Sequence, residues 1–153
     1  MKKTIPTDVS EVKLTYRSKV RAADRPQIGC SYHAYEVLQT HWDEGTIALC
    51  EEFYVLLLDR SNRVMGRYRV SQGGLAGTVV DAKMIFAAAL KARSSALILA
   101  HNHPSGNLCP SKADQELTQK IAEAGKLLDL PILDHLILSP EGGYYSFADE
   151  GLM

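Results

Sequence analysis

The sequence has few cysteines and lacks several features that would assign it to a class at once. Three cysteines occur in 153 residues, Cys30, Cys50 and Cys109, and no two of them form a CxxC pair. An odd number without that spacing argues against a disulfide framework and against a cysteine zinc knuckle. No apolar run approaches the roughly 20 residues of a membrane-spanning helix, and the basic start is not followed by the apolar stretch of a secretory signal. We therefore expect a cytoplasmic protein without membrane contact.

The composition is that of one globular domain with an uneven distribution of charge. With 153 residues, 46% of them hydrophobic, the chain is long enough for a single core. Residues 1–30 carry seven Lys and Arg against three Asp and Glu, whereas the remainder carries ten against fifteen. We expect a basic N-terminal strand or arm over residues 1–30 and the main domain over 31–153. Weak nucleic-acid contact through the arm is one interpretation of its charge, and a solvated basic strand is the simpler one.

Hydrophobic periodicity predicts an α/β (α+β mixed) single domain, in which a mixed β-sheet is flanked by helices. Ser31, Asp81 and Ser111 are the expected N-caps of three helices. The glycine-rich segment 71–78 lacks the GxxxxGK[ST] pattern of a phosphate-binding loop, so it is expected to be an ordinary loop. Strands are expected in the segments 11–18, 51–59, 64–70, 95–100, 131–139 and 144–148.

The segment HNHPSGNLCPSKAD, residues 101–114, contains the side chains most suited to bind a metal ion. In extended backbone His101 and His103 project to the same side, where two imidazoles can converge on one ion, while Asn102 points away. Asp114 falls in the first turn of the helix that Ser111 would cap. Two imidazoles and a carboxylate supply three corners of a zinc tetrahedron and leave the fourth to water, as in catalytic zinc sites. The spacing predicts an open Zn²⁺ site.

Helix capping is the competing explanation for part of this segment. Ser111 and Asp114 fit a variant of the capping box, which needs no metal. Capping leaves the two histidines unexplained, and Ser111 could serve both purposes. The zinc nucleobase deaminases are excluded, because they require HxE followed by PCxxC.

Two further side chains have alternative interpretations. His135 lies in the apolar run LDHLIL, where it is either a hydrogen-bonded core residue supporting the site through Asp134 or a fourth nitrogen near the metal. Cys109 is either an ordinary loop residue or a thiol that binds zinc in place of water.

The pattern HxH, seven residues and SxxD resembles the signature of the JAMM metallopeptidases, the JAB1/MPN/Mov34 domain. The wider text HNHPSG, LDHLIL and YYSFADEG is similar to bacterial RadC proteins over residues 31–153. The resemblance implies an MPN-type fold and a zinc metallopeptidase-like hydrolase, in which a metal-activated water cleaves an amide, peptide or isopeptide bond of a protein or peptide-like substrate. It also implies a glutamate general base at the start of an apolar strand, which is Glu52 with Glu51 as the alternative, and a Ser111 hydroxyl that stabilises the oxyanion. On this basis Glu52→Gln is expected to keep zinc and lose hydrolysis.

The chain departs from the RadC pattern in two places. It has no counterpart of the N-terminal helix-hairpin-helix of longer RadC proteins, and DAK at residues 81–83 stands where proline and arginine are frequent. The first departure removes the best argument for DNA contact. The rival hypothesis is a non-catalytic MPN-like module for protein or DNA association, connected with DNA repair or recombination. No residue pattern identifies the substrate or the oligomeric state.

Overall fold

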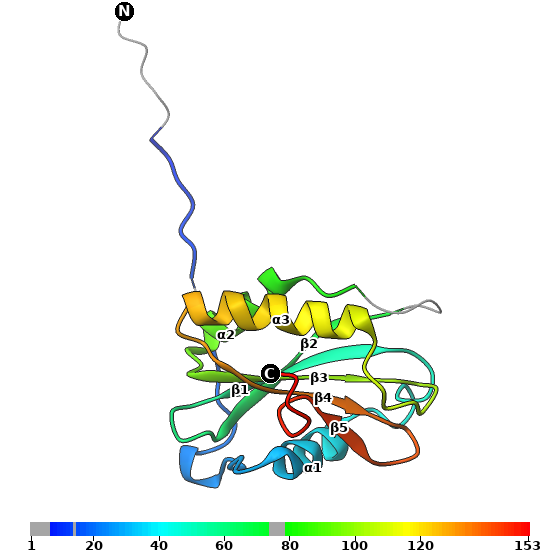
Figure 1. The fold of residues 1–153 in the computed structure, drawn as a ribbon. Coiled ribbons are helices and arrows are strands. Elements are labelled where there is room, and N and C mark those ends of the chain that lie inside the picture. The colour runs from blue at the N-terminus through cyan, green and yellow to red at the C-terminus, as the bar shows by residue number, and fades with distance from the viewer. Residues whose placement is uncertain (1–6, 14, 74–78) are drawn as a thin grey trace, which may run out of the picture.

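The computed structural model describes residues 7–13, 15–73 and 79–153. Within them a five-stranded sheet has the order β2-β1-β3-β4-β5, and only the central pair β3 and β4 is parallel. Helix α1 covers one face of the sheet, and α2 and α3 cover the other (Figure 1). The expected single α/β domain is therefore confirmed. Its elements are α1 (Ser31–His41), β1 (Glu52–Leu58), β2 (Val64–Gln72), α2 (Ala82–Ala92), β3 (Ala96–Asn102), α3 (Lys112–Leu127), β4 (Ile132–Leu138) and β5 (Tyr144–Ser146).

The central strands have a continuous hydrophobic sequence because both faces of the sheet are covered. Every residue of β1 and of β3 is buried. Alternate residues of a strand face opposite sides, so Phe53 of β1 packs towards α2 and α3, whereas Tyr54 packs towards α1. This alternation decides which polar side chains at the strand ends can meet.

The helix ends agree with the sequence at two of the three expected caps. The Asp81 carboxylate accepts a hydrogen bond from the backbone N–H of Lys83 at 2.9 Å, and Ser111 caps α3. Ser31 was expected to cap α1, but it is the first residue of the helix and Cys30 occupies the cap position. Its hydroxyl instead donates to the Asp149 carboxylate and contacts the Tyr144 hydroxyl, so it links α1 to the C-terminal segment.

The strand expected over residues 11–18 is not present in its described part, and Leu14 lies outside the described residues. The side chains of Val12 and Tyr16 are 83% and 40% exposed. An alternating pattern becomes a strand only when a neighbouring strand supplies a hydrogen-bonding ladder. The described part of this segment instead contacts β2 through a side chain, because the Tyr16 hydroxyl donates to the carbonyl of Met65. A short 3-10 turn, η1 (Ala22–Asp24), follows.

The loop expected over residues 71–78 begins later than predicted, because Ser71 and Gln72 belong to β2. Residues 74–78 lie outside the described part of the chain. None of the described helices is long and apolar enough to cross a membrane.

Candidate metal centre

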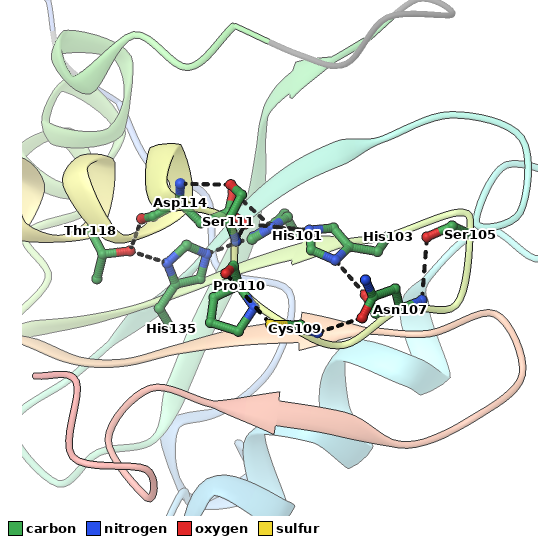
Figure 2. Close-up of polar contacts among 10 residues, drawn as sticks. All are labelled: His101, His103, Ser105, Asn107, Cys109, Pro110, Ser111, Asp114, Thr118 and His135. Carbon is green, nitrogen blue, oxygen red and sulfur yellow. Dashed lines mark hydrogen bonds and ion pairs between the residues drawn. The ribbon is translucent and has the colours of Figure 1, made fainter.

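The end of β3 and the start of α3 bring His101, His103 and Asp114 together (Figure 2). The Nε2 atoms of the two histidines lie 3.0 Å apart. The Asp114 carboxylate places Oδ1 3.3 Å from His101 Nε2 and Oδ2 3.5 Å from His103 Nε2. His101 is almost fully buried, at 1% exposure, whereas His103 and Asp114 are partly accessible. The cluster is therefore accessible to solvent through His103 and Asp114.

The spacing of these three donors fits a divalent metal ion. Zinc bonds of 2.0–2.1 Å to nitrogen or oxygen in a tetrahedron separate the donor atoms by about 3.3 Å, close to the three separations in the cluster. Two imidazoles and one carboxylate form a donor set that suits zinc, and such a set leaves one tetrahedral corner for water. His101, His103 and Asp114 could therefore hold Zn²⁺.

The proton position on His103 is set by a backbone carbonyl. Its Nδ1 lies 2.6 Å from the carbonyl oxygen of Asn107. A carbonyl oxygen only accepts, so Nδ1 carries the hydrogen. In the neutral ring Nε2 then presents a lone pair, and in the protonated ring it donates to Asp114. That lone pair points towards His101 and Asp114, as a metal ligand requires.

The charges of the cluster favour a cation between these groups. Burial would raise the pKa of Asp114, but the imidazoles of His101 and His103 beside its carboxylate outweigh burial and hold that pKa well below its ordinary value. The hydrogen bond to Asp114 raises the pKa of His103, and the nearby Glu51 carboxylate adds to the effect. The carboxylate is thus ionised across the neutral pH range, ready to bind a positive ion.

Ser111 and Asp114 also form the capping box that the sequence suggested. The Ser111 hydroxyl oxygen accepts from the Asp114 N–H at 3.0 Å, and Asp114 Oδ2 accepts from the Ser111 N–H at 2.8 Å. Capping and metal binding are therefore compatible, because the cap fixes the orientation of the carboxylate whose oxygens face the histidines. The hydroxyl hydrogen of Ser111 is not used in the cap and can be donated elsewhere.

Glu52 and Glu51 lie on opposite faces of the sheet. The buried Glu52 carboxylate accepts hydrogen bonds from Thr46, from Tyr54 at 3.2 Å and from Arg69 at 3.3 Å, all outside the metal cluster. Glu51 lies two residues before Phe53, so in extended backbone the two side chains face the same side of the sheet. The Phe53 ring stacks on His101 with 5.9 Å between centroids. The carbonyl of Glu51 accepts from the Gly73 N–H at 2.8 Å, which continues the extended backbone of β1. The charge of Glu51 raises the pKa of His103, whereas the Glu52 carboxylate has its hydrogen-bond partners outside the metal cluster.

Asn102 points away from the metal cluster, as expected, and has a function that the sequence did not indicate. Its side-chain amide donates to the carbonyls of Ile47 and Cys50 at 2.7 and 2.9 Å and accepts from the Glu52 N–H at 2.7 Å. This buried amide anchors the segment that leads into β1, and so the position of Glu51.

His135 is a buried, hydrogen-bonded residue that supports the site through His101 instead of Asp134. Its Nε2 lies 2.8 Å from His101 Nδ1, and its Nδ1 lies 2.6 Å from the Thr118 hydroxyl. Burial lowers the pKa of His135 well below its ordinary value, so the ring is neutral. With both nitrogens occupied, it is not a fourth ligand. Asp134 instead accepts from Ser146 and from the backbone N–H of Ala148 and His135.

Cys109 lies on the loop but outside the cluster. It is exposed, and its thiol lies 3.9 Å from the carbonyl oxygen of the neighbouring Pro110. Neither Thr118 nor Asn107 was assigned a role from the sequence. The signal for Thr118 was its position one helical turn after Asp114, which places it on the same face of α3.

Comparison with known proteins gives a match over most of the chain. A family model described as RadC-like JAB domain matches residues 28–152. A UPF0758 protein of Flavobacterium johnsoniae is 53% identical over 102 residues, which are 67% of this chain and 44% of the relative. A UPF0758 protein of Syntrophotalea carbinolica is 36% identical over 140 residues, 90% of this chain and 58% of the relative. The chain thus spans about half the length of the curated relatives it matches.

Proposed function

The chain belongs to the family of RadC-like JAB domains, and from this premise we propose that it is a zinc-dependent hydrolase that cleaves an amide, peptide or isopeptide bond. The observation that carries the proposal is the convergence of His101 Nε2, His103 Nε2 and the Asp114 carboxylate at separations of 3.0–3.5 Å. A closed structural zinc site has four protein ligands, whereas three ligands are typical of a catalytic site. Bound zinc would lower the pKa of a coordinated water towards about 7 and polarise a substrate carbonyl.

Glu51 is the proposed general base. It is half-buried, lies on the same side of the sheet as His101 and is close enough to raise the pKa of His103. A carboxylate there can take a proton from the attacking water and return it to the departing amine. Glu52 was the first choice from the sequence, but its carboxylate is committed to Arg69 and Tyr54 on the opposite face.

Ser111 is proposed to stabilise the oxyanion that forms on the substrate carbonyl. Its hydroxyl oxygen accepts from the Asp114 N–H, so its position is fixed while its hydrogen stays free to be donated. A donor placed in advance contributes roughly 2.7–4 kcal/mol in other hydrolases. The expected substrate is a protein or peptide-like amide, because a polarised carbonyl attacked by water is the chemistry that this set of groups serves.

The first experiment measures the zinc content of protein purified without chelator or histidine tag, with wild type beside His103→Ala. We expect about one zinc per chain in the wild type and loss in the variant. Cleavage of model peptide and isopeptide substrates follows, with and without chelator. Zinc-loaded protein that leaves every substrate intact would favour a binding module, and wild-type protein that takes up no added zinc would overturn the metal site.

The rival hypothesis of DNA association depends on the basic arm. Three of its basic side chains are already paired with acidic ones, because Lys13 lies 3.8 Å from Glu11, Arg21 2.6 Å from Asp24 and Arg25 3.3 Å from Asp59. These pairs reduce the positive charge that could meet phosphates. We expect any DNA affinity to change little with salt concentration. A steep loss of DNA binding with added salt would support the hypothesis of DNA association.

A further inference from the structure

A buried chain of hydrogen bonds runs behind the metal cluster, from α3 through β4 to β3 (Figure 2). The Thr118 hydroxyl lies 2.6 Å from the backbone carbonyl of Asp114 and 2.6 Å from His135 Nδ1. His135 Nε2 then lies 2.8 Å from His101 Nδ1. Thr118 and His135 are buried, at 2% and 0% exposure, so water does not compete for these contacts.

The direction of every hydrogen in this chain follows from its first member. A hydroxyl has one hydrogen, and the carbonyl of Asp114 can only accept, so Thr118 donates there. The Thr118 oxygen must then accept from His135 Nδ1–H. His135 packs between the rings of Phe53 and Phe147, with centroid distances of 5.4 and 4.7 Å, and such a buried ring is neutral. Its Nε2 is therefore an acceptor.

The last step concerns His101. Since His135 Nε2 accepts, His101 Nδ1 must be the donor, and His101 Nε2 is left with a lone pair directed at His103 and Asp114. We propose that Thr118 and His135 are positioning residues that hold His101 in the Nδ1–H tautomer before any metal binds. The inference rests on the proposed function only in taking His101 as a metal ligand.

The hydrogen-bonded chain Thr118–His135–His101, here called the relay, gives His101 a partner of a different kind from that of His103. His103 reaches a loop carbonyl directly, at Asn107, whereas His101 is buried between strands whose own carbonyls are used in the sheet. The acceptor that orients it must therefore be a side chain. Thr118 and Asp114 lie one turn apart on α3, so the helix that supplies the carboxylate ligand also sets the tautomer of the buried histidine.

Removing the Thr118 hydroxyl should reverse the direction of the hydrogen bond between His135 and His101. In Thr118→Val the Nδ1–H of His135 loses its acceptor, so the ring favours the other tautomer and donates from Nε2 to His101 Nδ1. His101 then carries its hydrogen on Nε2, where the metal would bind. Partners of this kind typically contribute 10- to 100-fold to metal affinity, and we expect a loss of zinc affinity in that range.

The test combines histidine tautomers with zinc affinity in the full chain. In metal-free protein with ¹⁵N-labelled histidine, long-range ¹H–¹⁵N correlation spectra should show His101 and His135 as Nδ1–H. Thr118→Val should shift His101 to Nε2–H and weaken zinc binding, and Thr118→Ser should restore both properties. The matched control is Thr40→Val, because the Thr40 hydroxyl makes the same bond to the carbonyl four residues earlier, Glu36 at 2.7 Å, on α1 away from the site.

Each outcome decides the proposal. His101 as Nε2–H in metal-free wild type would overturn it, and that measurement needs no variant to fold. Unchanged tautomer and affinity in a folded Thr118→Val would also overturn it. A protein with the expected tautomers that binds no zinc would contradict the proposed function and leave the relay intact.

Discussion

At the scale of single residues, Glu51 and Glu52 differ in their partners although they are adjacent in the chain. Glu51→Gln should keep zinc and fold while reducing hydrolysis by about 10²–10⁴-fold, the usual contribution of a general base. Glu52→Gln should instead lower the free energy of unfolding by about 1–3 kcal/mol, because an amide nitrogen would replace one of the two buried oxygens that accept hydrogen bonds from Thr46, Tyr54 and Arg69. Turnover per folded molecule and urea unfolding measure the two effects. Normal turnover in Glu51→Gln would return Glu52 to consideration.

The titration of His103 and Asp114 predicts how the metal-free fold responds to pH. The pKa of His103 is raised above 6.5, so its stabilisation is full below 6.5 and is lost as the pH rises through the raised pKa. The pKa of Asp114 is lowered below 3.8, so its stabilisation is present above 3.8 and is lost only as the pH falls through the lowered pKa. Urea unfolding of metal-free protein should show this pair contributing more near about pH 5 than near about pH 8. Asp114→Asn should remove that difference, and an unchanged difference would disprove the coupling.

Zinc affinity should have the opposite pH dependence and fall with decreasing pH, because His103 must lose its proton to bind.

At the scale of elements, the end of β3 organises the segment before β1 through one buried amide. Asn102→Ala would leave the carbonyls of Ile47 and Cys50 and the N–H of Glu52 without this partner. Each buried group left unsatisfied costs about 1–3 kcal/mol, so we expect a loss of roughly 3 kcal/mol in the free energy of unfolding, allowing for relaxation. Gln39→Ala, on the exposed face of α1, is the control and should change stability by less than about 0.5 kcal/mol. A change in Asn102→Ala no larger than that of the control would show that the amide is not an anchor.

At the scale of the whole molecule, bound zinc would join β3, the loop after it and α3. Ligand binding to the folded state stabilises by about 2.7 kcal/mol when free zinc is 100 times its dissociation constant. For a chain of this size that corresponds to a rise of roughly 5–10 °C in Tm. Calorimetry of wild-type protein with zinc and with chelator measures it, and His103→Ala should show little difference between the two conditions. Equal Tm values for zinc-loaded and chelated wild type would contradict the site.

The local pattern of the sequence determined most elements of this fold. Both faces of β1 are covered, so its apolar run predicted the strand, and Asp81 and Ser111 predicted helix starts because a cap acts within three residues of chain. The same locality explains why His101, His103, Ser111 and Asp114 could be grouped before the structure was considered. The local pattern predicted a strand wrongly in the described part of residues 11–18, because alternation alone does not supply a neighbouring strand.

Tertiary structure alone decided which distant groups complete the site. The sheet face taken by Glu51 or Glu52 depends on the register of β1 against β3, and a shift of one residue would exchange them. The contact of His135 with His101 requires β3 and β4 to pair in parallel, and Thr118 joins them only because α3 packs across that face. The sequence by itself determined the ligand types and their local spacing. Long-range packing decided that Glu51, His135 and Thr118 lie near these ligand residues, because they are far apart in the chain and meet only in the folded sheet.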